Sequence, residues 1–167
     1  MLIQGQGFLI KDININEIDS ILQVYKQCED FLSLGPVPNA FKKMVLDDLE
    51  LSKKEGGIFC GIYIDDEMIG IVDFVPDNFE GNPKNAVISL LMISSSYRRK
   101  GIGRNVVNVV ENEILKNRSI EAILSGVQVN NESAIDFWVK MGYKIFSGPE
   151  LMPDTTIVFG LRKDIRC

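Results

Sequence analysis

The chain has 167 residues, of which 46% are hydrophobic and 25% charged, so we expect one domain over residues 1–167 with a buried core. Its net charge of −5 and pI of about 4.8 argue against general nucleic-acid binding, which needs a broad basic face. The chain has no histidine, the commonest metal ligand and general base, and we expect no metal.

Three scattered cysteines, Cys28, Cys60 and Cys167, match neither a metal-site spacing nor a disulfide framework. We interpret Cys28 and Cys60 as small buried apolar residues and expect a reducing, cytoplasmic compartment. Residues 1–5 have no basic start and no long apolar core, which predicts no secretory signal. No apolar run approaches the roughly 20 residues of a membrane span, so we expect no membrane partner.

The spacing of apolar residues predicts the element order β-α-α-β-β-β-α-β-α-β-β. Strands are predicted over residues 8–13, 58–64, 68–75, 86–93, 121–129, 143–146 and 155–161. Helices are predicted from Asn14 or Asn16 to about Gln27, from Asn39 to the glycines at 56–57 with Phe41, Val45 and Leu49 buried, over 104–117 with Val106, Val107, Val110 and Ile114 buried, and over 133–141. Residues 31–38 and 76–85 are predicted loops.

The middle of the chain predicts a mixed sheet. The strand at 86–93 is apolar on both faces, so it should be central. The strand-helix-strand unit over 86–129 predicts a parallel pair joined by a right-handed crossover, and the earlier hairpins predict antiparallel pairs. We therefore expect an α/β (α+β) fold with helices on both faces of a mixed sheet.

The short loop between the predicted central strand and the next helix carries four cations and two glycines. Residues 96–104 read Ser-Tyr-Arg-Arg-Lys-Gly-Ile-Gly-Arg. Glycines let backbone N–H groups approach an anion, and the first turn of a helix has N–H groups without an internal partner. The alternative is a solvated turn. Val106 stands where a dinucleotide fold has its third glycine, and a P-loop would need Gly-Lys-Ser/Thr, so the loop predicts phosphate binding of another kind.

A second motif covers residues 131–143, which read Asn-Glu-Ser-Ala-Ile-Asp-Phe-Trp-Val-Lys-Met-Gly-Tyr. It resembles the pattern Asn-x-x-Ala-x-x-Phe-Tyr-x-Lys-x-Gly-Phe of the GCN5-related N-acetyltransferases (GNAT), and residues 98–103 match that family's Arg/Gln-x-x-Gly-x-Gly/Ala. The resemblance is close over 86–146. It implies a mostly antiparallel sheet in which the parallel strands, at 86–93 and 123–129, splay apart beside the glycine loop.

The resemblance implies acetyl-CoA as the cosubstrate. Its pyrophosphate would bind backbone N–H groups of residues 99–104, and its pantetheine arm would bond the open strand edge. Asn131 is expected to bond a pantetheine or CoA group, with a helix cap as the alternative role. The residues predicted to contact acetyl-CoA are Met92, Ile93, Arg98, Arg99, Lys100, Gly101, Ile102, Gly103, Arg104 and Asn131. The family often dimerises, so a homodimer is an expectation by analogy.

Trp138 stands where the family often has a tyrosine that protonates the leaving thiolate. An indole N–H is far too weak an acid for that role. Three outcomes stay open. The CoA thiol can leave with little help, since reference thiol pKa values lie near ~8.5; Tyr97 or Tyr143 can serve; or the domain binds CoA without turnover.

The general base is equally open, because the predicted strand at 86–93 contains no acid and Ser89 is its polar residue. Family members often place a glutamate there. Asp73 is the candidate catalytic residue, since it is an ionisable side chain in the otherwise apolar run 69–75. An outward-facing strand residue is the alternative, and we favour water as the proton acceptor over any named base.

The function predicted from these residues is transfer of an acetyl group from acetyl-CoA to a primary amine of a small molecule or peptide, directly and through a tetrahedral intermediate. The alternatives are a non-catalytic CoA-binding or sensor domain and transfer of a longer acyl group. Acceptor specificity is expected from loops 29–39, 76–85 and 148–154, which border the acceptor side in the family. Acids in these loops either attract an amine or are solvated: Glu29, Asp30, Asp77 and Glu80.

Overall fold

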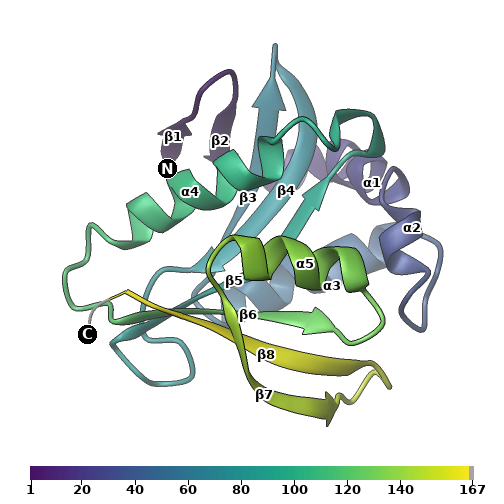
Figure 1. Cartoon of the computed structure of the whole chain (residues 1–167). Coiled ribbons are helices and arrows are strands. Elements are labelled where there is room, and N and C mark those ends of the chain that lie inside the picture. The colour runs from purple at the N-terminus through teal and green to yellow at the C-terminus, as the bar shows by residue number, and fades with distance from the viewer. Residues whose placement is uncertain (166–167) are drawn as a thin grey trace.

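One parallel pair of strands interrupts an otherwise antiparallel sheet (Figure 1). The computed structural model describes residues 1–165, in which eight strands follow the order β1-β2-β3-β4-β5-β6-β8-β7. The strands are β1 (Leu2–Gln4), β2 (Leu9–Asp12), β3 (Ile58–Ile64), β4 (Glu67–Val75), β5 (Asn85–Ile93), β6 (Ala122–Gln128), β7 (Lys144–Leu151) and β8 (Ile157–Asp164). The helices are α1 (Ile18–Lys26), α2 (Glu29–Leu32), α3 (Lys42–Lys54), α4 (Ile102–Ile114) and α5 (Glu132–Lys140), with 3-10 turns η1 (Ile15–Glu17) and η2 (Ser95–Tyr97).

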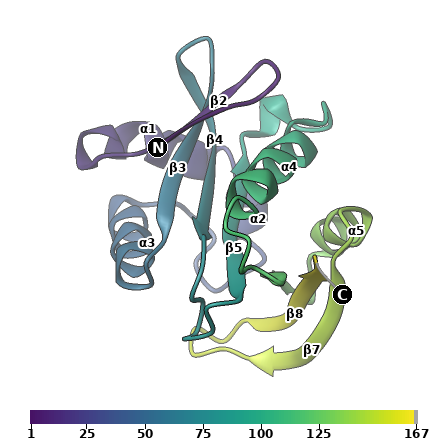
Figure 2. The same cartoon turned by 90° about the vertical axis from the view of Figure 1, so that its left-hand side faces the viewer.

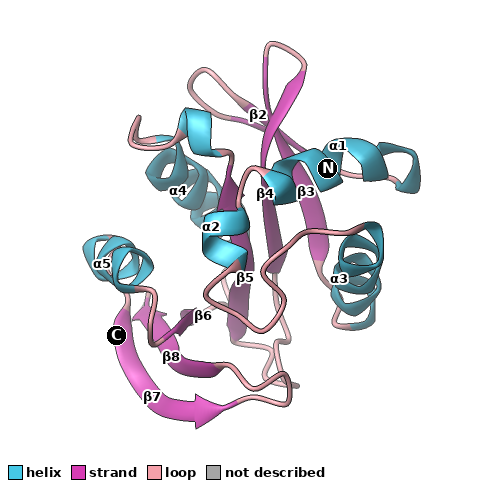
Figure 3. Cartoon of the chain, turned by 90° about the vertical axis from the view of Figure 1, so that its right-hand side faces the viewer, coloured by secondary structure: helices cyan, strands magenta, loops and turns pink. Residues whose placement is uncertain are grey.

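Helices cover both faces of this sheet (Figures 2 and 3). On one face α1 and α3 pack against the strands, and Val45 and Ile71 are fully buried there. On the other face α4 and α5 pack against the strands and bury Val106 and Trp138. Burial of an apolar stripe is what holds a helix to a sheet, so each layer follows from the helical spacing of apolar residues in the sequence.

The predicted fold class is confirmed. The central strand lies between β4 and β6, the parallel pair is joined through α4, and the remaining pairs are antiparallel. The stripe predicted for α4 is buried: Val106, Val107, Val110 and Ile114. Cys28 and Cys60 are buried and unpaired, as predicted, whereas Cys167 lies outside the described residues.

Several boundaries differ from the predictions. Strand β1 and helix α2 were not predicted, because three and four residues are too few for a pattern of apolar residues to repeat. Helix α3 begins at Lys42, later than Asn39, and Phe41 is 45% exposed although it was predicted to be buried. Phe41 is the N-cap with extended backbone (φ −148°), so its side chain leaves the buried stripe. Strands β7 and β8 run on to Leu151 and Asp164.

The parallel strands diverge after a short contact. Residues Asn85–Val87 of β5 pair with Ala122–Leu124 of β6, and no further pairs follow within residues 1–165. At the next position Ser125 Oγ donates a hydrogen bond of 2.9 Å to the Ile88 carbonyl. This bond bridges the two strands at the point where backbone pairing stops, and it satisfies a carbonyl that has lost its strand partner.

A bulge in β5 coincides with the divergence. Asp73 of β4 pairs with Leu90 and Phe74 pairs with Ile88, so Ser89 is an extra residue on β5. A bulge of this kind bends the strand that carries it. Ser89 Oγ donates to the Asp73 carbonyl at 3.1 Å, which stabilises the irregular pairing. The splayed strands implied by the family resemblance are therefore present.

Two further observations concern the part of the chain that the structure describes. No helix within residues 1–165 is both long enough and apolar enough to cross a membrane. Within the same residues, no three metal-ligating side chains of the Cys, Asp and Glu types gather at a common point.

Candidate active site

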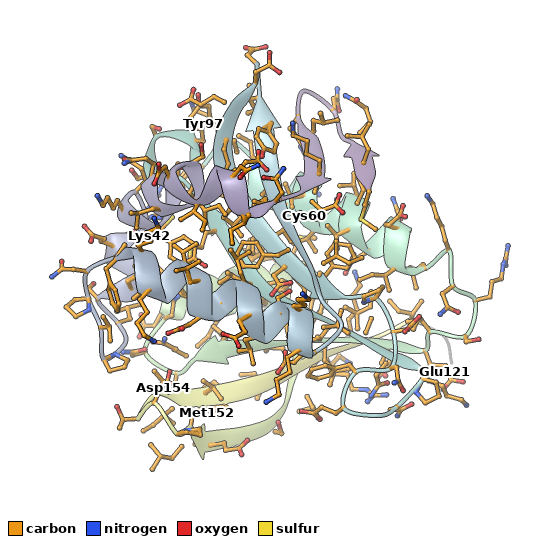
Figure 4. The ribbon with its side chains drawn as sticks, turned by 180° about the vertical axis from the view of Figure 1, so that it is seen from behind. Lys42, Cys60, Tyr97, Glu121, Met152 and Asp154 are labelled. Carbon is orange, nitrogen blue, oxygen red and sulfur yellow. The ribbon has the colours of Figure 1, made fainter. Side chains whose placement is uncertain are left out.

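A cavity of about 790 Å³ lies between the diverging strands β5 and β6. Its walls come from β5 (88–93), β6 (125–128), the loop into α4, and residues of α2 and α5. This volume falls in the range of roughly 300–1,000 Å³ found for small-molecule sites. Tyr97 and Met152 both line the cavity and lie well apart in Figure 4, so it has one end at the basic loop and another at the β7–β8 connection.

The basic loop presents backbone N–H groups to the first end of the cavity. Arg99 and Gly101 both have left-handed backbone, with φ of +60° and +78°. Gly101 is the N-cap of α4, and the Asn105 N–H makes the first bond back to it, 3.1 Å from the Gly101 carbonyl. The amides of Ile102–Arg104 therefore have no partner within residues 1–165, at the positive end of a 13-residue helix. Such an arrangement binds anions such as phosphate.

Arg98 has a different role from its neighbours in the loop. Two of its guanidinium nitrogens donate to both carboxylate oxygens of Asp30 on α2, and its Nε donates to the Ile93 carbonyl at 2.8 Å. Cys28 Sγ, just before α2, donates to the same carbonyl at 3.4 Å. A bidentate guanidinium–carboxylate pair has fixed geometry, so Arg98 joins α2 to the end of β5. Figure 3 shows helix α2 beside this strand.

The other residues predicted to contact acetyl-CoA line the cavity, with one exception. Met92 and Ile93 lie in its β5 wall, and Arg99 and Arg104 are exposed at the loop with no ion pair within residues 1–165. Lys100 is not part of the lining; its ammonium lies 5.4 Å from the centre of the Tyr97 ring. Among the loop cations that line the cavity, Arg99 and Arg104 thus have no ion-pair partner within residues 1–165, while the Arg98 guanidinium is paired with Asp30.

Asn131 has the helix-cap role that its sequence position allowed, and its contact with a ligand stays a prediction. It is 9% exposed, and its Oδ1 accepts from the Ala134 N–H at 3.2 Å and from Ser133 Oγ at 3.3 Å. It is therefore the N-cap of α5. Its Nδ2 makes no hydrogen bond within residues 1–165, and the residue lines the cavity. The cap uses one end of the side-chain amide and leaves the donor end for a ligand.

Aromatic residues close the cavity on the α5 side. Trp138 is 6% exposed, and its ring packs edge-on against Phe137 and Tyr143 with centroid distances of 5.3 and 4.9 Å. The Tyr143 hydroxyl donates to Glu111 Oε2 at 2.8 Å, and burial raises the pKa of Tyr143. Lys163 Nζ bonds the same carboxylate at 3.0 and 3.1 Å. Tyr143 therefore belongs to an ionic cluster with Glu111 and Lys163, and it does not line the cavity, so it is poorly placed to act as an acid.

Tyr97, the other tyrosine considered as an acid, is also hydrogen-bonded. Its hydroxyl donates to Glu67 Oε2 at 3.1 Å, at the β3–β4 hairpin, and this bond is the first cause of its raised pKa. A donated bond to a carboxylate holds the phenol in its neutral form. Its ring lines the cavity, so its contribution there is a surface for packing.

Asp73 is buried beneath α3 and is 7% exposed. Its Oδ1 accepts a hydrogen bond of 2.7 Å from Ser52 Oγ, and it is not among the residues that line the cavity. Burial raises the pKa of Asp73, partly opposed by the bond from Ser52. Leu90, its partner across the β4–β5 pair, does line the cavity. Asp73 therefore lies one strand away from the cavity wall, and its role as a base stays a prediction.

The loops expected to bind the acceptor divide into two groups. Phe31 and Leu34 from one loop and Met152 from another line the second end of the cavity, whereas no residue of 76–85 does. That loop joins β4 to the start of β5, at the end where β5 and β6 are still paired. Asp30 bonds Arg98, and Glu29 Oε2 accepts from the Ala40 N–H at 2.7 Å.

Sequence reasoning missed the β6 wall of the cavity. Ser125, Gly126 and Gln128 line it, and Val158 of β8 lies beside them. A glycine inside a strand was the available signal, because it marks a place where another molecule approaches the backbone. A Cβ on Gly126 would meet just the Phe159 carbonyl, at 3.9 Å, so the cavity side of this strand is open.

The chain belongs to the acetyltransferase (GNAT) family, whose family model matches residues 18–143. It is 37% identical over 105 residues to N-alpha-acetyltransferase 50 of Danio rerio (63% of this chain, 58% of that protein). It is 35% identical over 88 residues to the probable N-acetyltransferase san of Drosophila melanogaster (53% and 47%). The matched part thus spans about half the length of these curated relatives.

Solved structures show the same fold. An acetyltransferase from Thermus thermophilus superposes with a TM-score of 0.79 at 15% identity, covering 99% of this chain and all of that one. PaiA N-acetyltransferase from Thermoplasma acidophilum, solved in complex with coenzyme A, superposes with a TM-score of 0.69 at 18% identity, covering 96% and 100%. The family and fold predicted from the two motifs are therefore confirmed.

The two loop glycines should respond differently to the same substitution. Gly101→Ala places a side chain at φ +78°, which costs about 1–2 kcal/mol and should lower the melting temperature by roughly 2–8 °C. Gly103→Ala is the matched control, because its Cβ would lie 3.7 Å from the Phe137 ring, an ordinary contact. Thermal denaturation with and without acetyl-CoA measures both, and we expect the ligand-induced shift to shrink for Gly101→Ala. Equal effects at both positions would contradict the role of the left-handed cap.

The substitution Asp73→Asn tests whether the Asp73 carboxylate has a structural or a catalytic role. Asparagine keeps an acceptor for Ser52 Oγ, and the Asp73 carboxylate does not line the cavity, so we expect kcat/KM to stay within about threefold of the wild-type value. A loss of about 10²-fold or more would establish Asp73 as the base. Initial rates of thiol release measure the difference.

The same variant has a pH signature in stability. Because the folded-state pKa of Asp73 is raised above 3.8, the native carboxyl holds its proton more tightly than the unfolded one. Wild-type stability from this group is then present at low pH and is lost as pH rises through the folded-state pKa. Asp73→Asn should therefore gain stability relative to wild type from about pH 4 upward, measured by urea denaturation, and the two should converge at lower pH.

Proposed function

We propose that this protein is an acetyl-CoA-dependent N-acetyltransferase that transfers the acetyl group directly to the α-amine of a peptide. The observation that carries the proposal is one cavity that connects the unpaired amides of α4 with an apolar end formed by α2 and the β7–β8 connection. Donor and acceptor can then meet beside the open edge of β5, where the strands have separated.

The donor end fits acetyl-CoA. The amides of Ile102–Arg104 would hold the pyrophosphate, with Arg99 and Arg104 adding charge, and Asn131 Nδ2 is an available donor for an amide of the pantetheine arm. The open edge of β5 is a place where an extended amide chain can bind as an added strand. When bound, acetyl-CoA supplies an acetyl group activated as a thioester.

The acceptor end favours a peptide over a polyamine. Asp30 is the one acid in the lining formed by residues 1–165, and it is paired with Arg98. A multiply charged amine would need several carboxylates there. Phe31, Leu34, Met152 and Val158 instead make this end apolar. Relatives named N-alpha-acetyltransferase 50 and N-alpha-acetyltransferase 30 agree with an α-amine as the acceptor.

Proton transfer in this proposal relies on water. The hydroxyls of Tyr97 and Tyr143 are bonded to glutamates, and Trp138 has no acidic proton. The amine therefore loses its proton to solvent in the open cavity, and the CoA thiolate leaves unprotonated at neutral pH or takes a proton from water. The same absence of an acid favours the second candidate, a domain that binds CoA without turnover.

A panel of acceptors tests the proposal. We expect release of free CoA thiol, and a peptide mass increase of one acetyl group, with peptides that have a free N-terminus. The same peptides with a blocked N-terminus and an internal lysine should give at least about tenfold less product, as should spermidine, because residues 1–165 offer no unpaired acid in the cavity lining. Preference for lysine or spermidine would overturn the acceptor class. Stabilisation by acetyl-CoA without thiol release from any acceptor would establish the non-catalytic candidate.

A further inference from the structure

The side-chain amide of Gln128 is buried at one end and has no hydrogen-bond partner. Gln128 is the last residue of β6, and its Oε1 is the buried side-chain oxygen that lacks a partner in residues 1–165. Its Nε2 makes no hydrogen bond there either. The side chain lines the cavity.

Buried polar atoms nearly always have a partner in native proteins. An unpaired buried polar atom destabilises the folded state, and it persists where a function requires it. Gln128 is therefore a place where a ligand with a complementary group would bind and remove that cost. The missing partner must be a donor for Oε1, and an acceptor for Nε2 would complete the pair.

The position of Gln128 assigns it to the acceptor end of the cavity. It pairs with Val158 of β8, and a Cβ on Gly35 would lie 3.5 Å from its Nε2. The neighbouring Asn130 Nδ2 donates to the Leu34 carbonyl at 3.1 Å, which holds the loop after α2 over the end of β6. The amide thus lies between the two segments that form the apolar end, away from the α4 amides.

We propose that Gln128 recognises the first peptide group of the acceptor: Oε1 accepts the backbone N–H that follows the reacting residue, and Nε2 donates to a backbone carbonyl. In an extended peptide the N–H and C=O of one residue point to the same side, so one primary amide can accept from the first and donate to the second. A simple alkylamine has no such group. This inference rests on the proposed function and makes Gln128 a residue that selects peptides over simple amines.

Gln128→Leu tests the inference in the whole chain. We expect kcat/KM for a free N-terminal peptide to fall about tenfold, mostly through KM, because an interaction made equally in ground and transition states is lost. The rate with a simple alkylamine and the thermal shift produced by acetyl-CoA should not change. The ligand-free variant should be at least as stable as wild type, because it loses an unpaired buried amide.

Two controls sharpen the result. Gln23→Leu makes the same change at an exposed position of α1 that does not line the cavity, and it should have no effect on either acceptor. A peptide with an ester in place of its first amide lacks the N–H. The kcat/KM of the wild type should therefore be about tenfold lower for this ester than for the peptide, whereas the kcat/KM of Gln128→Leu should be the same for both.

The outcomes separate this inference from the proposed function. Suppose that the wild type acetylates peptides. If Gln128→Leu then has an unchanged KM for the peptide, or if its rates with the peptide and the alkylamine fall by the same factor, Gln128 does not bind the peptide group. If wild type transfers acetyl to no acceptor, the proposed function fails. In that case the inference about Gln128 is tested by binding alone. The peptide is titrated against the CoA-bound wild type and against CoA-bound Gln128→Leu, and equal dissociation constants for the peptide would overturn the inference.

Discussion

The separation of β5 from β6 is the constraint on which the rest of the site depends. Two parallel strands would normally continue side by side and satisfy each other's backbone groups. Here pairing stops after Val87 and Leu124, with a bulge at Ser89 on one edge and the Ser125 hydroxyl on the Ile88 carbonyl at the other. A buried parallel pair thereby becomes a groove with an open strand edge, and the loop into α4 lies at its end.

In the basic loop (residues 96–104), the backbone and the side chains have different roles beside this groove. The left-handed residues Arg99 and Gly101 turn the chain so that α4 starts with its amides directed at the cavity. Arg98 faces the other way and joins α2 to β5 through Asp30 and the Ile93 carbonyl. A change at Arg98 would therefore disturb both α2 and the end of β5, since one side chain contacts both.

Much of this arrangement could be predicted from the sequence because it depends on local patterns. The spacing of Val106, Val110 and Ile114 predicted α4 and its buried face, and the glycines of the loop predicted a place for an anion. The role of Arg98 could not be predicted, because its partner Asp30 is 68 residues away and belongs to a helix of a single turn. The prediction that Trp138 is a poor acid rests on indole chemistry alone, whereas the bond from the Tyr143 hydroxyl to Glu111 joins segments 32 residues apart and has no signal in the sequence.

The sequence by itself determined the family, the order of the main elements and the position of the basic glycine loop, because each depends on residues close together along the chain. The tertiary structure alone decided which charges remain available, where Asp73 lies and which residues form the acceptor end. These features depend on contacts between distant segments: α3 covers Asp73 through Ser52, and the loop after α2 meets Gln128 at the end of β6. No local pattern records such contacts, because burial and pairing arise when the helices pack against the sheet.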